Sequence, residues 1–318
     1  MHTLSKIKSP SPVKSVDGNR ALPAAAYLAS LRTAPSRAGM VSALNAAAFS
    51  ICGKRDWQAV AWSKLNAAIV KAALAKCEGA PATRNKLLSA LKGTARAAWQ
   101  LGVVSLEDFE KIRSVKGDTG ARLPKGRDIR PRETQKLLEV CASDKTAAGR
   151  RDAAILAIAA ATGARRAELA SLRIENMRRE NGLTIFRVIG KRDKEREIYL
   201  HNGAQAALND WLAVRGTQAG AVFNPINKGG RIENAGITTT AMHKILAKRA
   251  TEAGVENVTL HDFRRTVTGD LLDKGADIAS VASLLGHASV NTTARYDRRG
   301  QRARIAASQL VSVPYVAA

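Results

Sequence analysis

Acidic residues are scarce in this chain. Its 318 residues include 51 lysines and arginines against 27 aspartates and glutamates, which gives a net charge of +24 and a pI near 10.6. An excess of this size favours a polyanionic partner, and nucleic acid is the natural candidate. A membrane surface is the competing explanation for the charge.

Long hydrophobic runs are also missing. The longest, Ala153 to Ala161, is far below the ~20 residues that a spanning helix needs. Residues 1–20 carry lysines and an arginine among serines and prolines, without the apolar stretch of a signal peptide. We therefore expect a flexible basic tail over residues 1–20 and no membrane partner.

Cysteine is rare, and no metal-ligand spacing or phosphate-cradling glycine loop is present. Cys52, Cys77 and Cys141 are odd in number and far apart, which indicates a reducing cytosolic setting. We expect them to be small buried hydrophobic residues. We also expect no cofactor and no bound metal.

A hydrophobic content of 45% over this length allows one large domain or two ordinary ones, and we predict two. Residues 21–114 are alanine-rich with helical periodicity, with helix starts expected at Asp56, Pro81 and Ser105. They predict a small helical domain. Residues 115–131 are rich in cations, glycine and proline, which predicts a basic interdomain linker that contacts phosphates.

Residues 132–310 change to a mixed pattern, which predicts a mostly helical domain with one small antiparallel sheet. Two strands are expected at 183–189 and 196–200. Helices are expected at 133–142, 150–161, 166–172, 203–215, 238–253, through the His261 segment to 272, and at 278–285, 292–296 and 301–310. The fold class is mainly α overall, and residues 311–318 form an apolar tail.

The C-terminal region gathers groups that suit attack on a phosphodiester. Arg264 can donate paired N–H groups to phosphate oxygens. His261 and His287 can donate or shuttle a proton near neutral pH. Tyr296 can then act as a covalent nucleophile.

These residues resemble motifs of the tyrosine recombinases, also called the phage integrase family. Thr162 to Leu169 is similar to the family's first arginine box, and Ile189 to Arg196 is similar to its β-hairpin lysine segment. Six elements occur in the family's order, a specific signal where a single His-x-x-Arg would be weak. The matching catalytic positions are Arg165, Lys191, His261, Arg264, His287 and Tyr296.

The resemblance implies a role for each group. Arg165 and Arg264 would clamp the non-bridging phosphate oxygens, and Lys191 would protonate the leaving 5′ oxygen. His261 would assist proton transfer at the nucleophile, and His287 would hydrogen-bond the phosphate. Tyr296 would hold the 3′ phosphate as an ester, so resealing needs neither ATP nor metal.

Some choices stay open at this point. Lys194 lies beside Lys191 on the same turn and could be the acid instead. Asn176 stands where the family usually has an acidic residue that supports the site, although Glu175 is adjacent. Arg166 and Arg265 each follow a motif arginine, but one helical residue turns a side chain by ~100°, so both should point elsewhere.

The helix expected from Pro81 onward combines an apolar stripe, which includes Leu87, Leu91 and Ala95, with cations largely off that stripe. A basic face of this kind is either a solvated surface or a groove-binding surface. The segment resembles the last long helix of the family's core-binding domain, which favours DNA contact. The expected DNA-binding residues are Arg84, Lys86, Lys92 and Arg96 on this helix and Lys116, Arg122 and Lys125 in the linker.

The resemblance implies a bacterial, cytoplasmic and nucleoid-associated site-specific recombinase that works through a 3′-phosphotyrosyl intermediate. Its partners would be double-stranded DNA with a core site, accessory DNA-binding proteins and three further copies in a synaptic tetramer. The tail 311–318 would dock on a neighbouring copy. The alternatives are a type IB topoisomerase and a catalytically inactive DNA-binding regulator; the spacing from His287 to Tyr296 and the apolar tail favour recombination.

Overall fold

The computed structural model describes residues 21–119, 126–190, 195–287, 289–297, 300 and 308. The chain divides into two compact units, Met1–Pro124 and Lys125–Ala318. The division falls inside the stretch predicted to be a linker. Each unit is described by itself.

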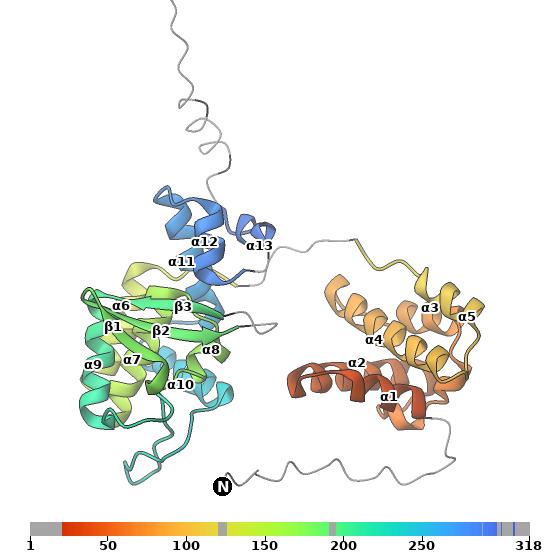
Figure 1. Ribbon diagram of the computed structural model, residues 1–318, viewed down its shortest axis with the longest axis horizontal. Coiled ribbons are helices and arrows are strands. Elements are labelled where there is room, and N and C mark those ends of the chain that lie inside the picture. The colour runs from red at the N-terminus through yellow and green to blue at the C-terminus, as the bar shows by residue number, and fades with distance from the viewer. Residues whose placement is uncertain are drawn as a thin grey trace, which may run out of the picture. The chain divides into compact units, whose positions relative to one another are not determined.

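The first unit is helical, as expected (Figure 1). Pro81 begins its longest helix, and the Ser105 side chain caps another by accepting from the N–H of Asp108. Asp56 caps a short 3-10 helix. The α-helix predicted to start there is not found. The elements are α1 (Leu22–Ser30), α2 (Ala34–Cys52), η1 (Trp57–Ala59), η2 (Trp62–Lys64), α3 (Ala67–Ala75), α4 (Pro81–Gln100) and α5 (Leu106–Arg113).

The core of this unit forms around α4, whose predicted apolar stripe is buried. Trp62 is fully buried beneath it, and its indole N–H donates to the carbonyl of Trp57 at 2.7 Å. Gly93 lets α1 approach α4, because a Cβ there would lie 2.2 Å from the ring of Tyr27. Helices α1 and α4 are therefore closely packed.

Hydrogen bonds hold both ends of the stretch predicted to be a linker. At its start, Asn85 on α4 donates to the carbonyl of Asp118 at 2.9 Å and accepts from its N–H at 2.8 Å. At its end, the N–H of Arg127 donates to Asp262 at 3.1 Å, within the second unit. Residues 120–125 lie outside the described part of the chain.

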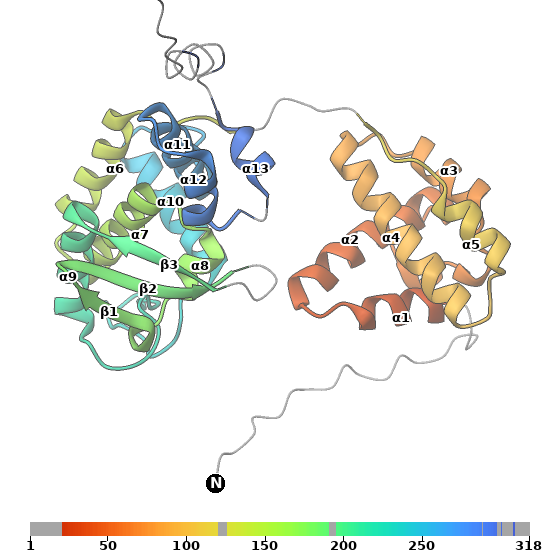
Figure 2. The ribbon, with the colours of Figure 1, turned by 45° about the horizontal axis from the view of Figure 1, so that its top comes forward.

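The second unit is mostly helical with one small sheet, as expected (Figures 1 and 2). The predicted strand 183–189 is found with those bounds. The elements are α6 (Pro131–Ser143), α7 (Ala147–Thr162), α8 (Arg166–Ala170), η3 (Ile174–Asn176), β1 (Met177–Glu180), β2 (Leu183–Ile189), β3 (Glu195–Leu200), α9 (Asn202–Arg215), α10 (Thr239–Glu252), α11 (Leu260–Asp273), α12 (Ile278–Leu285) and α13 (Val290–Ala294).

The sheet has three antiparallel strands in the order β1-β2-β3, one more than predicted. The extra strand β1 carries three charged residues in four, so its composition gives no strand signal. A signal existed in the turn: Asn181 and Gly182 both have positive φ, at 49° and 77°, and Asn-Gly is typical of tight hairpins. Strand β1 then forms by antiparallel pairing with β2, in which Met177 lies opposite Phe186.

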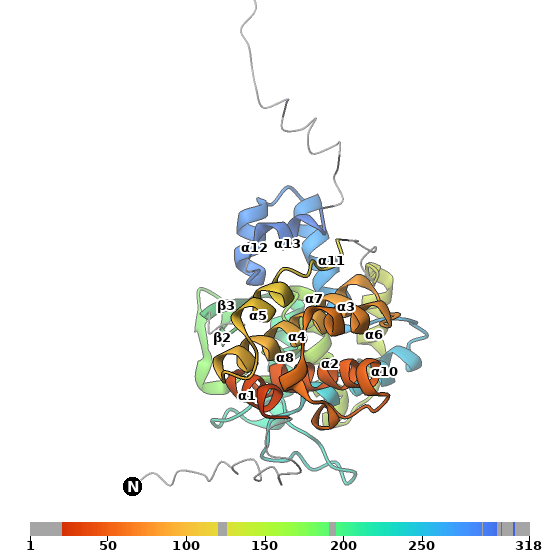
Figure 3. The ribbon, with the colours of Figure 1, turned by 90° about the vertical axis from the view of Figure 1, so that its right-hand side faces the viewer.

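The core of this unit lies between the sheet and the helices around α7, and Figure 2 shows the strands beside α7. Phe186 and Ile198 from the sheet and Trp211 from α9 are buried there. Helices α11, α12 and α13 group at one end of the unit (Figure 3), where Leu272, Val281 and Leu285 form a second small cluster. That end carries most of the predicted catalytic residues.

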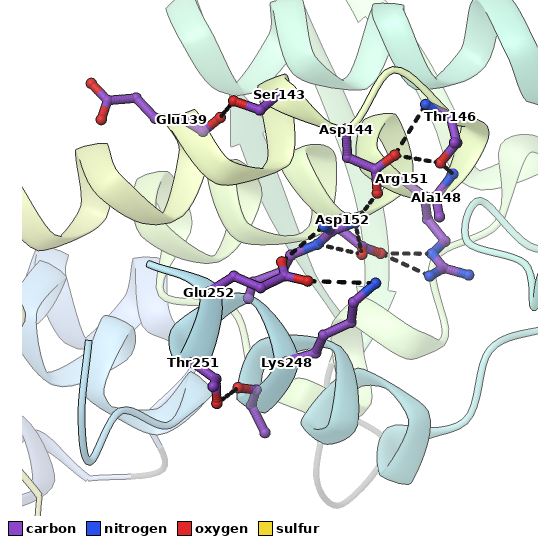
Figure 4. A network of polar contacts seen from close by, with 12 residues as sticks. Glu139, Ser143, Asp144, Thr146, Ala148, Arg151, Asp152, Lys248, Thr251 and Glu252 are labelled. Atoms are coloured by element: carbon purple, nitrogen blue, oxygen red, sulfur yellow. Dashed lines mark hydrogen bonds and ion pairs between the residues drawn. The ribbon is translucent and has the colours of Figure 1, made fainter. Parts of the chain in front are cut away.

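A buried ion network joins α6, α7 and α10 (Figure 4). The Arg249 guanidinium, whose side chain is 3% exposed, contacts Asp144 at 2.6 Å and Asp152 at 2.8 Å. Arg151 also binds Asp152, at 2.8 Å. Two arginines thus compensate a buried aspartate, which lets this polar group remain inside the protein.

The cysteines only partly follow the expectation of burial. Cys141 is buried, and its removal from water raises the pKa of the thiol to about 12. Cys77 is half-buried and Cys52 is exposed, so the expectation is wrong for Cys52, which ends α2 at the surface. No helix in the described part of the chain is long and apolar enough to cross a bilayer.

Candidate active site

The end of α12 holds the two predicted phosphate-binding arginines. The carbonyl of Leu285 accepts from Arg264 at 2.6 Å and from Arg165 at 3.4 Å, and the carbonyl of Gly286 accepts from Arg165 at 2.6 Å. The last carbonyls of a helix lack partners within it and carry partial negative charge. They therefore fix two guanidiniums side by side.

A glycine turn brings α7 close to this end. Arg264 donates to the carbonyl of Gly163 at 2.9 Å. Gly163 has a φ of +57°, and a Cβ there would lie 3.2 Å from the Cα of Arg264 and 3.1 Å from the side chain of Leu285. Glycine at this position thus permits both the left-handed backbone and the close approach.

The tyrosine and both histidines lie at the same place. Tyr296, just after α13, has its hydroxyl 3.2 Å from Nε2 of His261. The rings of His287 and Tyr296 are 6.2 Å apart between centroids, and Nδ1 of His287 lies 2.7 Å from the hydroxyl of Thr293. A nucleophile within hydrogen-bond reach of a base is the arrangement that covalent catalysis requires.

The electrostatics of the site favour an anion. Burial, followed by the charge of Arg264, lowers the pKa of His261 and lowers that of His287 to about 4. Burial and the nearby charge of Arg165 lower the pKa of Arg264 to about 10. Both imidazoles are therefore neutral at pH 7, and a bound phosphate would relieve the repulsion between the cations.

Glu168 is the carboxylate that supports Arg165. Its side chain is 3% exposed, and it accepts from the backbone N–H and from Nη1 of Arg165, each at 2.8 Å. Burial opposes its ionisation, but hydrogen bonds and charge from Arg196 and Arg165 lower its pKa. Glu175, by contrast, binds Arg173 and the N–H of Gly220. One signal in the sequence could have identified Glu168: it stands three residues after Arg165, the spacing of a capping box at a helix start.

Two arginines expected to point elsewhere lie near the site. The guanidinium of Arg265 is 5.3 Å from the ring centroid of Tyr296, so that expectation is wrong. Arg166 lines a cavity of about 480 Å³ together with Arg165, His261, Arg264 and, from α10, His243. The direction of the Arg166 side chain stays a prediction, and His243 gave no signal in the sequence.

The remaining predicted residues divide into three groups. Lys191 and its alternative Lys194 lie outside the described residues, between strands paired as far as Ile189 and Glu195. Arg122 and Lys125 also lie outside them. In the first unit, Arg84 is bound to Asp118 at 3.1 Å and Lys92 to the carbonyl of Val115 at 2.7 Å. The exposed cations among the predicted set are Lys86, Arg96 and Lys116.

Arg84 and Lys92 thus hold the start of the linker, a role that the sequence pattern did not predict. Among the described residues, no cluster of histidine, cysteine, aspartate and glutamate is arranged to hold a metal ion.

Comparison with known proteins agrees with this geometry. The model of the phage integrase family matches residues 127–302. The tyrosine recombinase XerC of Corynebacterium efficiens is 34% identical over 224 residues, which cover 64% of this chain and 68% of that protein.

Two solved structures share the fold. The XerH recombinase bound to its difH substrate has a TM-score of 0.57 at 23% identity, covering 78% of this chain and 72% of that one. A lambda integrase tetramer bound to a Holliday junction has a TM-score of 0.63 at 14% identity, covering 87% and 76%. Since the family model matches more than half of its length, this chain belongs to the phage integrase family, the tyrosine-type site-specific DNA recombinases.

Proposed function

We propose that Tyr296 cuts DNA by attacking a backbone phosphodiester, and that the chain rejoins strands by reversing this step. The observation that carries the proposal is the 3.2 Å approach of the Tyr296 hydroxyl to Nε2 of His261, beside two arginines. Neutral His261 accepts the phenol proton as the oxygen–phosphorus bond forms. The bond to the 5′ oxygen breaks, and the 3′ phosphate stays on Tyr296.

Arg165 and Arg264 stabilise the charge that develops on the non-bridging oxygens. Backbone carbonyls already fix both arginines, and Glu168 also holds Arg165, so little reorganisation is needed when the phosphate arrives. His287, whose Nδ1 meets Thr293, presents Nε2 to the phosphate. Lys191 protonates the leaving 5′ oxygen, a role supported by its place in the sequence between the paired strands β2 and β3.

We further propose that the first unit and the linker bind the flanking duplex through phosphates. Lys86, Arg96 and Lys116 are exposed and suited to this contact. Four copies would assemble on paired core sites, an arrangement supported by the likeness of the fold to a tetrameric integrase on a Holliday junction.

The decisive experiment traps the covalent adduct on a nicked suicide substrate that carries the core site. The wild-type chain should become attached to the 3′ phosphate, and Tyr296→Phe should bind the same DNA without attachment. Peptide mapping then identifies the modified residue. An adduct on Tyr199 or Tyr315 would overturn the assignment, and relaxation of supercoiled DNA by single copies, without joining of two sites, would indicate a topoisomerase.

A further inference from the structure

Arg196 lies at the base of the hairpin that carries Lys191. It is on β3 opposite Val188, and the next pair toward the turn is Ile189 with Glu195, the last that the structure describes there. Its side chain is only 10% exposed. The catalytic mechanism above gives this buried cation no role.

The Arg196 guanidinium joins the hairpin to both other parts of the site. Nη1 donates to the carbonyl of Leu284 at 2.6 Å, and Nη2 contacts Glu168 at 2.7 Å. Leu284 lies in the same helix end that holds Arg165 and Arg264. Glu168 is the carboxylate that binds Arg165. One side chain thus fixes β3 against α12 and α8 together.

Gly286, which has no side chain, leaves room for the Arg196 side chain to reach α8 and α12. A Cβ at Gly286 would lie 2.7 Å from Cδ of Arg196, so a side chain there would displace the arginine. The arrangement also needs a fork-shaped donor, because the two acceptors lie on different elements. A lysine, with one compact ammonium, cannot reproduce the two-armed planar contact.

Stability alone does not account for the placement. Glu168 already has Arg165 as a partner, and burial of a second arginine costs desolvation energy. In addition, Nε of Arg196 is buried without a hydrogen-bond partner among the described residues. An unpaired buried N–H is unfavourable.

We propose that Arg196 is a positioning residue that fixes the base of the hairpin, so that Lys191 reaches the leaving 5′ oxygen. The proposal rests on the role of Lys191 given above. Loss of Arg196 should therefore resemble a partial loss of the general acid. It should not resemble loss of a phosphate-binding arginine.

The test replaces the leaving 5′ oxygen with sulfur, a better leaving group that needs no acid. Cleavage is measured in single-turnover reactions on both substrates for Arg196→Met, Lys191→Ala and Arg165→Ala. Arg178→Met is the matched control, because Arg178 also binds β3, through Glu197 at 2.7 Å, but lies exposed on the outer strand β1. Thermal melting and DNA binding are measured for each variant.

On the normal substrate, Arg196→Met should cleave at least ~10-fold more slowly, a partial loss of the ~10²–10⁴-fold that a general acid contributes. The sulfur substrate should restore most of that loss for Arg196→Met and Lys191→Ala but not for Arg165→Ala. Arg178→Met should cleave both substrates like the wild type. If Arg196→Met does not fold, Arg196→Lys keeps the charge and should show the same recovery.

Two results would overturn the proposal, and they are distinguishable. If the sulfur substrate restores Lys191→Ala but not Arg196→Met, Arg196 acts elsewhere and only this inference fails. If it restores neither variant, Lys191 is not the acid, and both that assignment and this inference fail. The Tyr296 assignment stands in either case, because it depends on the mapped adduct.

Discussion

At the scale of single residues, the site is a group of arginines fixed in positions that favour the binding of an anion. Arg264 and Arg196 donate to the last carbonyls of α12, and Arg165 donates to the last one and to that of Gly286, which follows. The buried carboxylate among them, Glu168, is shared by Arg165 and Arg196. The histidines stay neutral in this field, so His261 is available to accept a proton at pH 7.

The pKa of His287 tests whether burial and the nearby arginines keep the histidines of the site neutral. Its pKa is lowered to about 4 in the folded chain by burial and by nearby arginines, Arg264 first, whereas an unfolded histidine titrates near ~6.5. As the pH falls below ~6.5 the unfolded state takes up the proton first, so stability is lost progressively down to about pH 4. The loss should reach up to ~3 kcal/mol.

The measurement is a series of urea unfolding curves between pH 7 and pH 4, compared with His287→Asn, in which this part of the pH dependence should disappear. NMR titration of the imidazole gives the pKa directly. A bound DNA phosphate should raise it, because an anion stabilises the imidazolium. An unshifted titration near 6.5 in the free chain would contradict the cationic field described here.

At the scale of elements, two ion clusters have different tasks. The cluster around α12 holds the arginines that we propose bind the phosphate. The network in Figure 4 fastens α10, which carries His243, to α6 and α7. The second network touches no proposed reacting group, so it should affect folding first.

Arg249→Met should reveal this structural task. The change removes a 3% exposed guanidinium and leaves Asp144 and Asp152 short of a partner. Breaking one side of a buried pair typically costs ~3–5 kcal/mol. The free energy of unfolding, measured by denaturant titration, should fall by about this amount. Arg178→Met, which loses an exposed pair, should change it little, and equal effects of the two variants would refute the distinction.

Helix α4 carries two exposed cations that we propose bind DNA and two cations that are bound to the chain itself. Lys86 and Arg96 are exposed, whereas Arg84 and Lys92 hold residues 115–118. Neutralising Lys86 and Arg96 should weaken binding to specific and random duplexes alike. It should also flatten the slope of log K against log salt by up to ~0.9 for each phosphate that the protein no longer neutralises.

The matched double variant Arg84→Met with Lys92→Met should change that slope less, because those cations are already bound to the chain. Binding is measured by fluorescence anisotropy across a salt series on both duplexes. Weaker binding confined to the specific duplex, with an unchanged slope, would indicate base reading by α4. The same series with Lys116, Arg122 and Lys125 neutralised tests the linker.

At the scale of the whole molecule, catalysis is expected to depend on assembly. The apolar tail 311–318 lies outside the described residues, and its docking on a neighbouring copy stays a prediction. Buried apolar area contributes ~25 cal/mol per Å² before the cost of ordering the tail. Even a short segment can therefore decide whether copies associate.

Deleting residues 311–318 should leave binding to a single site nearly intact. It should reduce both the pairing of two sites and recombination, because the tail would join one copy to the next and would not touch the DNA. Native gel mobility separates singly bound, doubly bound and paired complexes, and a plasmid assay measures recombination. Normal tetramers from the truncated chain would show that the tail has no role in assembly.

Local signals in the sequence were sufficient for the family and for most elements of the second unit, although most predicted ends differ from the observed ones by a few residues. Arginine boxes, a His-x-x-Arg pair and a later tyrosine are short-range patterns, and capping residues and periodicity mark helix ends. The bounds of β2 and α12 follow in this way. Strand β1 was missed because its own residues are polar and its formation depends on pairing with β2.

Contacts between distant segments were decided only by the tertiary structure. Helical geometry correctly separates Arg265 from Arg264, but it cannot tell that the segment after α13 returns to place Tyr296 beside Arg265. The meeting of Arg196 with Glu168 and Leu284 likewise depends on how β3, α8 and α12 pack. The sequence by itself determined which candidate catalytic side chains the chain carries, because each belongs to a short local motif. Packing determined which carboxylate and carbonyls hold them, because those partners are set by the approach of separate elements.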